Sequence, residues 1–73
     1  MNNLTPKQQL VLDMIRQFKD NHDYSPTVSE LSWLIGINKN AVWKHLHSLE
    51  RKGYLKRDKR TARSIVLIEK ESG

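Results

Sequence analysis

The sequence contains no cysteine, which excludes a disulfide scaffold, a thiolate nucleophile and a cysteine-ligated zinc site. It has only three glycines and two prolines, and their placement indicates neither a linker nor a glycine-rich phosphate-binding loop. The aliphatic run from Ile65 to Ile68 is far too short to cross a membrane. The N-terminus lacks the basic and then apolar order of a signal peptide, so we expect a cytoplasmic protein.

The chain of 73 residues is long enough for one domain with a small core. Hydrophobic residues make up 37% of it, which is too many for wholesale disorder. We expect a single domain over residues 1–68 and a flexible tail over residues 69–73.

Positive charge is concentrated in the middle of the chain. The net charge is +5, but residues 38–63 alone carry nine basic and two acidic side chains, while residues 1–37 and 64–73 each sum to −1. A positive surface confined to one part of a small domain is the electrostatic footprint of a protein that binds a polyanion. The charge therefore favours a nucleic-acid partner over the alternative, a solvated basic face that keeps the chain soluble.

Local signals predict two helices in the first half. Residues 5–8 form a capping box with proline at the first helical position, and a stripe of apolar residues follows at helical spacing: Leu10, Val11, Met14, Ile15 and Phe18. This helix ends within residues 20–23, and residues 24–26 must be extended before a proline. A second box, residues 27–30, opens a short helix that Gly36 ends, with Trp33 opposite its apolar face.

A third helix and a hairpin are predicted in the second half. Asn38 caps a helix that runs to Lys52 and stops at Gly53. Its inner face carries Val42, His45, Leu46 and Leu49, its outer face carries Asn40, Lys44, His47 and Arg51, and Trp43 lies between them. Residues 54–57 and 64–68 are typical of strands and are joined by the basic loop 58–63, so we expect a hairpin that packs on the helices.

The second and third predicted helices are separated by about three residues that include a glycine. This is the helix-turn-helix arrangement, whose second helix enters the major groove of DNA. The hairpin is then a wing. The predicted fold class is mainly α, a winged helix-turn-helix with three helices plus a C-terminal two-stranded β-hairpin wing.

The sequence resembles the N-terminal DNA-binding domain of the LexA repressor family over roughly residues 3–68. The matching pieces are Leu4-Thr5, Gln8-Gln9, Ile15-Arg16, Ser25-Pro26-Thr27, Glu30-Leu31, Gly36, Asn40-Ala41, His45-Leu46, Leu49, Arg51-Lys52-Gly53, Arg63-Ser64-Ile65 and Leu67. The resemblance implies a sequence-specific transcriptional repressor, with a homodimer on two half-sites of double-stranded DNA.

Two departures from the family pattern shape what we expect. Trp43 and Lys44 stand where some relatives carry acidic residues, so we expect an operator different from the family's usual one. The family's self-cleaving C-terminal domain has no counterpart in these 73 residues. The small size suits a phage- or plasmid-type regulator or an excised DNA-binding domain.

We expect DNA contacts from three groups of side chains. The third helix contributes Asn38, Lys39, Asn40, Trp43, Lys44, His47 and Arg51, and the start of the second contributes Thr27 and Ser29. The wing contributes Lys59, Arg60 and Arg63, which we expect on the phosphate backbone or in the adjacent minor groove. An asparagine amide pairs with adenine, and a helix N-terminus binds phosphate. Asn38 and Thr27 are explained equally well as helix caps.

An exposed Trp33 beside Leu34 indicates a partner or dimer contact. No catalytic residue, metal, cofactor or small-molecule ligand is indicated, because His45 and His47 point apart on a helix and no nucleophile turn is present. Two alternatives stay open. One is a winged helix that binds another regulator, such as an anti-repressor; the other is an RNA-binding module, for which the hairpin offers only Tyr54 as a stacking platform.

Overall fold

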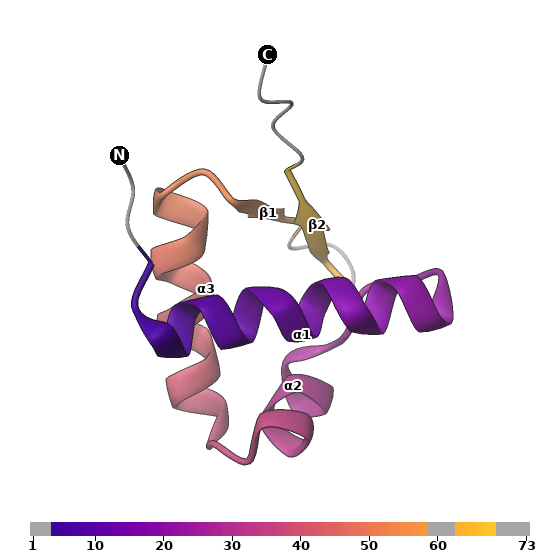
Figure 1. Cartoon of the computed structure of the whole chain (residues 1–73), viewed down its shortest axis with the longest axis horizontal. Coiled ribbons are helices and arrows are strands. Elements are labelled where there is room, and N and C mark those ends of the chain that lie inside the picture. The colour runs from indigo at the N-terminus through magenta and orange to yellow at the C-terminus, as the bar shows by residue number, and fades with distance from the viewer. Residues whose placement is uncertain (1–3, 59–62, 69–73) are drawn as a thin grey trace.

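The computed structural model describes residues 4–58 and 63–68. In these residues the elements follow in the order α1 (Pro6–His22), α2 (Val28–Ile35), α3 (Lys39–Arg51), β1 (Leu55–Arg57) and β2 (Ile65–Leu67). The three helices pack against one another, with α1 lying across α3, and β1 packs on α3 (Figure 1). The predicted fold class, a winged helix-turn-helix with a C-terminal hairpin, is confirmed.

Both predicted capping boxes are present. Thr5 Oγ1 accepts the Gln8 N–H at 3.1 Å, and Gln8 Oε1 accepts the Thr5 N–H at 3.1 Å. In the second box, Thr27 Oγ1 accepts the Glu30 N–H at 3.1 Å, and Glu30 Oε1 accepts the Thr27 N–H at 2.9 Å. Each box satisfies two backbone donors that a helix start leaves unpaired, so the starts of α1 and α2 are set by local sequence.

The turn between α2 and α3 is held by hydrogen bonds from its own residues. Gly36 adopts φ 81°, which a residue without Cβ tolerates, and the Ser32 carbonyl accepts the N–H groups of Gly36 at 2.9 Å and Ile37 at 3.2 Å. Ser32 Oγ donates to the Ile37 carbonyl at 2.6 Å. Asn38 Oδ1 then accepts the Ala41 N–H at 2.8 Å and begins α3. This turn fixes the direction of α3 relative to α2.

The core draws on all three helices and both strands. Its fully or almost fully buried members are Val11, Leu12, Ile15, Leu31, Val42, Leu46, Leu49, Leu55 and Ile65. Leu10, which belongs to the apolar stripe read from the sequence, is 41% exposed, while Leu12, which the stripe did not include, is 1% exposed. The buried positions of α1 are 8, 11, 12 and 15, a spacing that leaves residue 10 turned away from the core.

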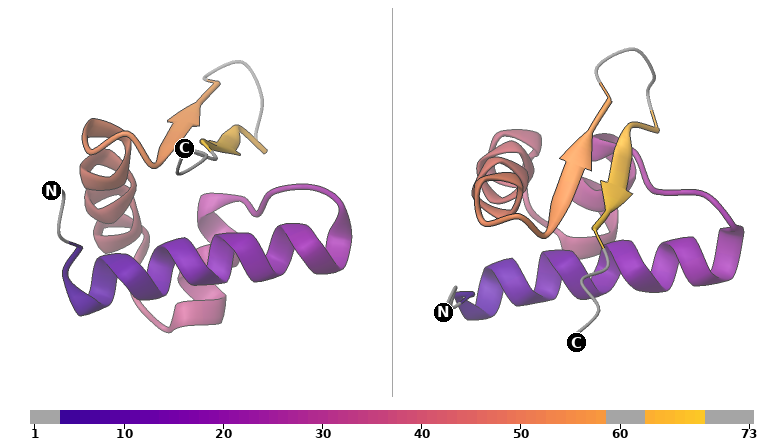
Figure 2. Two further views of the ribbon diagram at one scale, coloured as in Figure 1. Left: turned by 45° about the horizontal axis from the view of Figure 1, so that its top comes forward. Right: turned by 90° about the horizontal axis from the view of Figure 1, so that it is seen from above.

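The hairpin is shorter than predicted. Each strand has three residues, and the antiparallel register pairs Leu55 with Leu67 and Arg57 with Ile65. Figure 2 shows the two strands side by side, with β1 following directly from the end of α3. Helix α3 ends at Arg51 and not at Lys52, which is its C-cap. The predicted wing residues Lys59 and Arg60 and the predicted tail 69–73 lie outside the described residues.

None of the described helices combines the length and apolar character that crossing a bilayer requires.

The contrast between Leu12 and Leu10 gives a stability test. Leu12→Ala leaves a cavity in the core, so we expect the free energy of unfolding to fall by about 2–5 kcal/mol. Leu10→Ala, the matched control, should lower it by less than about 1 kcal/mol because the side chain is already half in water. Urea unfolding followed by circular dichroism measures both, and equal losses would contradict the assignment of the core.

Candidate nucleic-acid interface

One side of α3 is a continuous exposed stripe. The opposite side is packed into the core, so the direction of each remaining side chain follows from the 100° turn per residue. We call this stripe the recognition face; it consists of Asn40, Trp43, Lys44, His47 and Arg51, all of them exposed. The predicted outer face of the third helix is therefore exposed as expected.

The two asparagines at the start of α3 differ in which of their side-chain groups are already hydrogen-bonded. The Oδ1 atom of Asn38 is engaged by the Ala41 N–H, so its capping role is confirmed. Paired reading of adenine needs both the oxygen and the amide nitrogen, which makes Asn38 the weaker candidate. The side chain of Asn40 is exposed and has no hydrogen bond to another described residue. Asn40 therefore has both groups available.

Arg57 of β1 lies against the recognition face. Its guanidinium carbon is 4.6 Å from the centroid of the Trp43 ring, and Nη2 is 3.3 Å from His47 Nδ1. Its Nε and Nη2 both donate to Glu50 Oε1 at 3.3 Å, and its side chain is only 8% exposed. The sequence predicts Arg57 only as part of a strand within the positively charged stretch, with no role of its own. The inward direction of its side chain could have been predicted from the period of two along a strand, because Arg57 lies on the same face as the buried Leu55.

A second arginine clamps the start of β2 to the segment before α2. Arg63 Nη1 donates to Glu30 Oε1 at 2.7 Å and Nη2 to Glu30 Oε2 at 3.1 Å, a two-point ion pair. Nη1 also donates to the Ser25 carbonyl at 3.0 Å, and the guanidinium carbon lies 4.3 Å from the Tyr24 ring centroid. The sequence analysis assigned Arg63 to DNA; the structure gives it this intramolecular clamp, and the DNA contact stays a prediction.

The Arg63 clamp shifts the protonation of Glu30. The hydrogen bonds from Arg63, and after them the backbone N–H of Thr27, hold the pKa of the Glu30 carboxyl below its ordinary value of 4.5. The same contact raises the pKa of Arg63 above its ordinary value. Glu30 is therefore ionised at neutral pH, and it supplies the anion at the N-terminus of α2.

These contacts change which basic side chains are available to a polyanion. Arg57 is paired with Glu50 and Arg63 with Glu30, so both guanidinium groups already have anionic partners. Seven other cations are exposed and form no ion pair within residues 4–58 and 63–68: Lys7, Arg16, Lys19, Lys39, Lys44, Arg51 and Lys56. Lys7, Arg16 and Lys19 share α1 with Asp13 and Asp20, whereas the one acidic side chain of α3, Glu50, is paired with Arg57. The excess positive charge available to a polyanion therefore lies on α3, at Lys39, Lys44 and Arg51.

The start of α2 provides a second exposed surface. Thr27 Oγ1 accepts the Glu30 N–H, which confirms Thr27 as a helix cap. Ser29 is exposed on the first turn. The contacts of Thr27 and Ser29 with a phosphate stay predictions.

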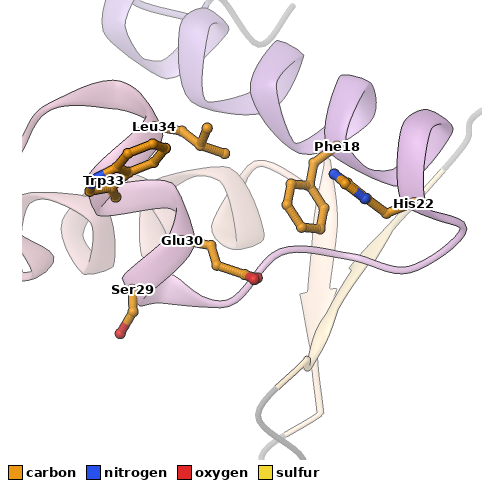
Figure 3. A pocket seen from close by; sticks show the side chains of 6 residues that line it. All are labelled: Phe18, His22, Ser29, Glu30, Trp33 and Leu34. Carbon is orange, nitrogen blue, oxygen red and sulfur yellow. The ribbon is translucent and has the colours of Figure 1, made fainter.

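An open apolar groove separates the end of α1 from the outer side of α2. Its volume is about 420 Å³, and its walls are Phe18, His22, Ser29, Glu30, Trp33 and Leu34. Figure 3 shows two of these side chains on α1 and four on α2. Trp33 is 83% exposed at its edge, as the sequence predicts for the residue opposite the apolar face.

The histidines do not assemble a metal site. His22 stacks near Phe18 and Tyr24, His45 is half-buried and His47 lies on the recognition face. Across residues 4–58 and 63–68, no three histidine or acidic side chains lie close enough together to hold a metal ion.

Comparison with known proteins identifies similar chains. The family model described as "LexA DNA binding domain" matches residues 1–64. The LexA repressor of Geotalea uraniireducens is 45% identical over 69 residues, which is 93% of this chain and 34% of the relative. That of Thermosipho melanesiensis is 34% identical over 97% of this chain and 36% of the relative. That of Alcanivorax borkumensis is 42% identical over 90% and 33%.

The chain spans about a third of the length of these curated relatives. The expectation of a phage- or plasmid-type regulator gains no support from them.

The Glu30–Arg63 ion pair gives a pH-dependent prediction. Because the folded-state pKa of Glu30 lies below the unfolded value, its contribution is present above about pH 4.5 and is lost as the pH falls through the folded pKa. Glu30→Gln keeps the capping acceptor but removes the charge. We expect this variant to unfold more easily than the wild type at pH 7 and equally easily near pH 2, by thermal melting. A difference that persists at pH 2 would contradict the assignment.

Proposed function

Because the chain belongs to the family of LexA DNA-binding domains, we propose that it is a sequence-specific, double-stranded-DNA-binding transcriptional repressor that acts in the cytoplasm. The single observation that carries this proposal is the recognition face, which combines amide, aromatic, imidazole and cationic groups on the exposed side of α3. The major groove of B-DNA, about 12 Å wide, admits a helix in this orientation.

The recognition face divides into groups that read bases and groups that bind the backbone. Asn40 presents an amide for adenine, and Lys44 presents a donor for guanine or a phosphate. Trp43 and His47 lie between them along the groove. Backbone contacts come from the remaining predicted residues, whose role is affinity and not selectivity: Thr27, Ser29, Asn38, Lys39, Arg51, Lys59, Arg60 and Arg63.

The groove beside Trp33 supports a contact between two copies of the chain on DNA. Repressors with this helix pair bind two half-sites as dimers, and a two-fold axis joins the same patch of both copies. Trp33 lies at the edge of the groove that Leu34 and Phe18 help to form. A two-fold arrangement of this patch places each indole against the groove of the other copy. The homodimer through Trp33 and Leu34 is the finer part of the proposal.

The same groove is the one observation that favours the alternative, a winged helix that binds another regulatory protein. The two functions use different surfaces, so variants on each surface separate them.

Substitutions on the recognition face should separate selectivity from affinity. Asn40→Ala should lose about 1–3 kcal/mol of preference for the best duplex over a single-base variant, with an unchanged salt slope. Arg51→Ala should weaken all duplexes alike and lower the slope of log K against log salt by about one. Lys7→Ala, on α1, is the control. Duplexes selected from a random pool and then titrated give these numbers. The absence of any preferred duplex at low salt contradicts the proposed function.

A pair of variants tests the role of Trp33. We expect Trp33→Ala to bind a single half-site as the wild type does but to lose cooperative binding to two half-sites, because only the contact between copies is removed. Lys44→Ala should weaken both. Sedimentation of complexes with one and two half-sites measures this.

The protein-binding alternative predicts the reverse: binding of the partner protein persists in Lys44→Ala and Arg60→Ala and is lost in Trp33→Ala. Duplex RNA and single strands, compared at the same salt, test RNA binding.

A further inference from the structure

We propose that Arg57 is a positioning residue that decides what the recognition face reads. The proposal rests on the proposed function and deepens it. Arg57 belongs to the wing strand β1, yet three of the side chains that its guanidinium meets, Trp43, His47 and Glu50, belong to α3. A residue outside the recognition helix therefore sets the orientation of two side chains on its DNA-facing side.

The contact with His47 fixes the tautomer of the imidazole. A guanidinium has five N–H donors and no acceptor, so the 3.3 Å contact between Arg57 Nη2 and His47 Nδ1 requires Nδ1 to accept. The proton of the neutral ring is then on Nε2. Because His47 is exposed on the recognition face, this Nε2–H is a donor available to a partner that lies against α3.

A donor at this place selects a base edge that carries acceptors. In the major groove guanine presents two acceptors, N7 and O6, whereas cytosine presents a donor. The Nδ1–H tautomer with a free Nε2 acceptor would reverse this preference. We therefore infer that Arg57 commits His47 to an acceptor-bearing base, guanine above all.

Trp43 is fixed by the same guanidinium. The Arg57 carbon lies 4.6 Å from the Trp43 ring centroid, and the Trp43 and His47 rings are 6.3 Å apart. Trp43 is 40% exposed, so one part of the indole packs against Arg57 and the rest is available to the groove. A cation over an aromatic face is attracted by the ring quadrupole, which favours one orientation of the indole.

The burial and pairing of Arg57 distinguish this role from phosphate binding. Its side chain is 8% exposed, and Glu50 accepts from two of its nitrogens, so the charge has a partner inside the molecule. The simpler interpretation is an ion pair that attaches the hairpin to α3. Glu50 alone would suffice for that attachment. The additional contacts with His47 and Trp43 are what support a role in reading.

The first arm of the test compares duplexes selected from a random pool by the wild type, Arg57→Met and Arg57→Lys. Methionine keeps the packing of the stem without the charge, and lysine keeps the charge without the planar donor fork. At the base pair that His47 contacts, we expect the affinity ratio between the preferred and the other base pairs to fall about tenfold in both variants. The slope of log K against log salt should not change. Lys56→Met, the exposed neighbour on β1, is the control and should select the wild-type motif. If Arg57→Met fails to fold, Arg57→Lys carries this arm.

The second arm needs no DNA. Long-range nitrogen–proton correlation spectra of the wild-type imidazole rings at pH 8.5 distinguish the two tautomers. We expect His47 to carry its proton on Nε2 alone, and both Arg57 variants to show a mixture, with Lys56→Met unchanged. If Arg57 served only to attach the hairpin through Glu50, its substitution would not change the tautomer of His47.

The outcomes separate the inference from the function on which it rests. A wild-type His47 with its proton on Nδ1, or variants that select an unchanged motif, overturns the positioning role. A wild type that selects no motif overturns the proposed function, and the tautomer spectra then decide alone whether Arg57 orders the imidazole.

Discussion

The arrangement of this molecule depends on the burial of one side of α3. Val42, Leu46 and Leu49 are completely inaccessible to solvent in the described residues, packed among side chains from the other helices and the hairpin. Successive residues of a helix are rotated by 100°, so the burial of these three residues determines which side chains of α3 face the solvent. The recognition face is therefore a consequence of core packing, and loss of the core would also lose the surface proposed to bind DNA.

The hairpin is attached to this core by charged groups as well as by apolar ones. Leu55 and Ile65 are buried, while Arg57 and Arg63 reach to Glu50 and Glu30 on α3 and α2. Two short strands have little stability by themselves, so these contacts are what make the wing part of the domain. One consequence concerns the electrostatics: two of the basic side chains are paired with carboxylates inside the domain, so they are less available to a phosphate backbone than the unpaired ones.

The comparisons and the structure support the proposal at different levels. Family membership covers residues 1–64 and supports DNA binding as a class of function. The exposed stripe on α3 supports the proposal of the side chains that would do so. Since the chain spans about a third of the length of its curated relatives, the comparison supports only the activity of the part that it matches.

The sequence by itself determined the features that depend on neighbours within four residues. Thr5, Thr27 and Asn38 cap helices as predicted because each cap bonds to a residue three positions away, and Gly36 supplies the left-handed turn. The outer face of α3 followed from its strong period. On α1, where Leu10 and Leu12 are both apolar, the sequence did not identify the buried one, because both residues fit a helical stripe and only the neighbouring helices choose between them. The partners of Arg57 and Arg63 were decided by tertiary structure, since Glu30 lies 33 residues from Arg63 and no local pattern relates the two. Arg57 lies against a carboxylate and an aromatic ring because a buried guanidinium must be paired and hydrogen-bonded, and in a chain this short the groups able to do so lie on another element. Arg63 remains exposed, and its partners on and before α2 come within reach only when the hairpin packs on the helices.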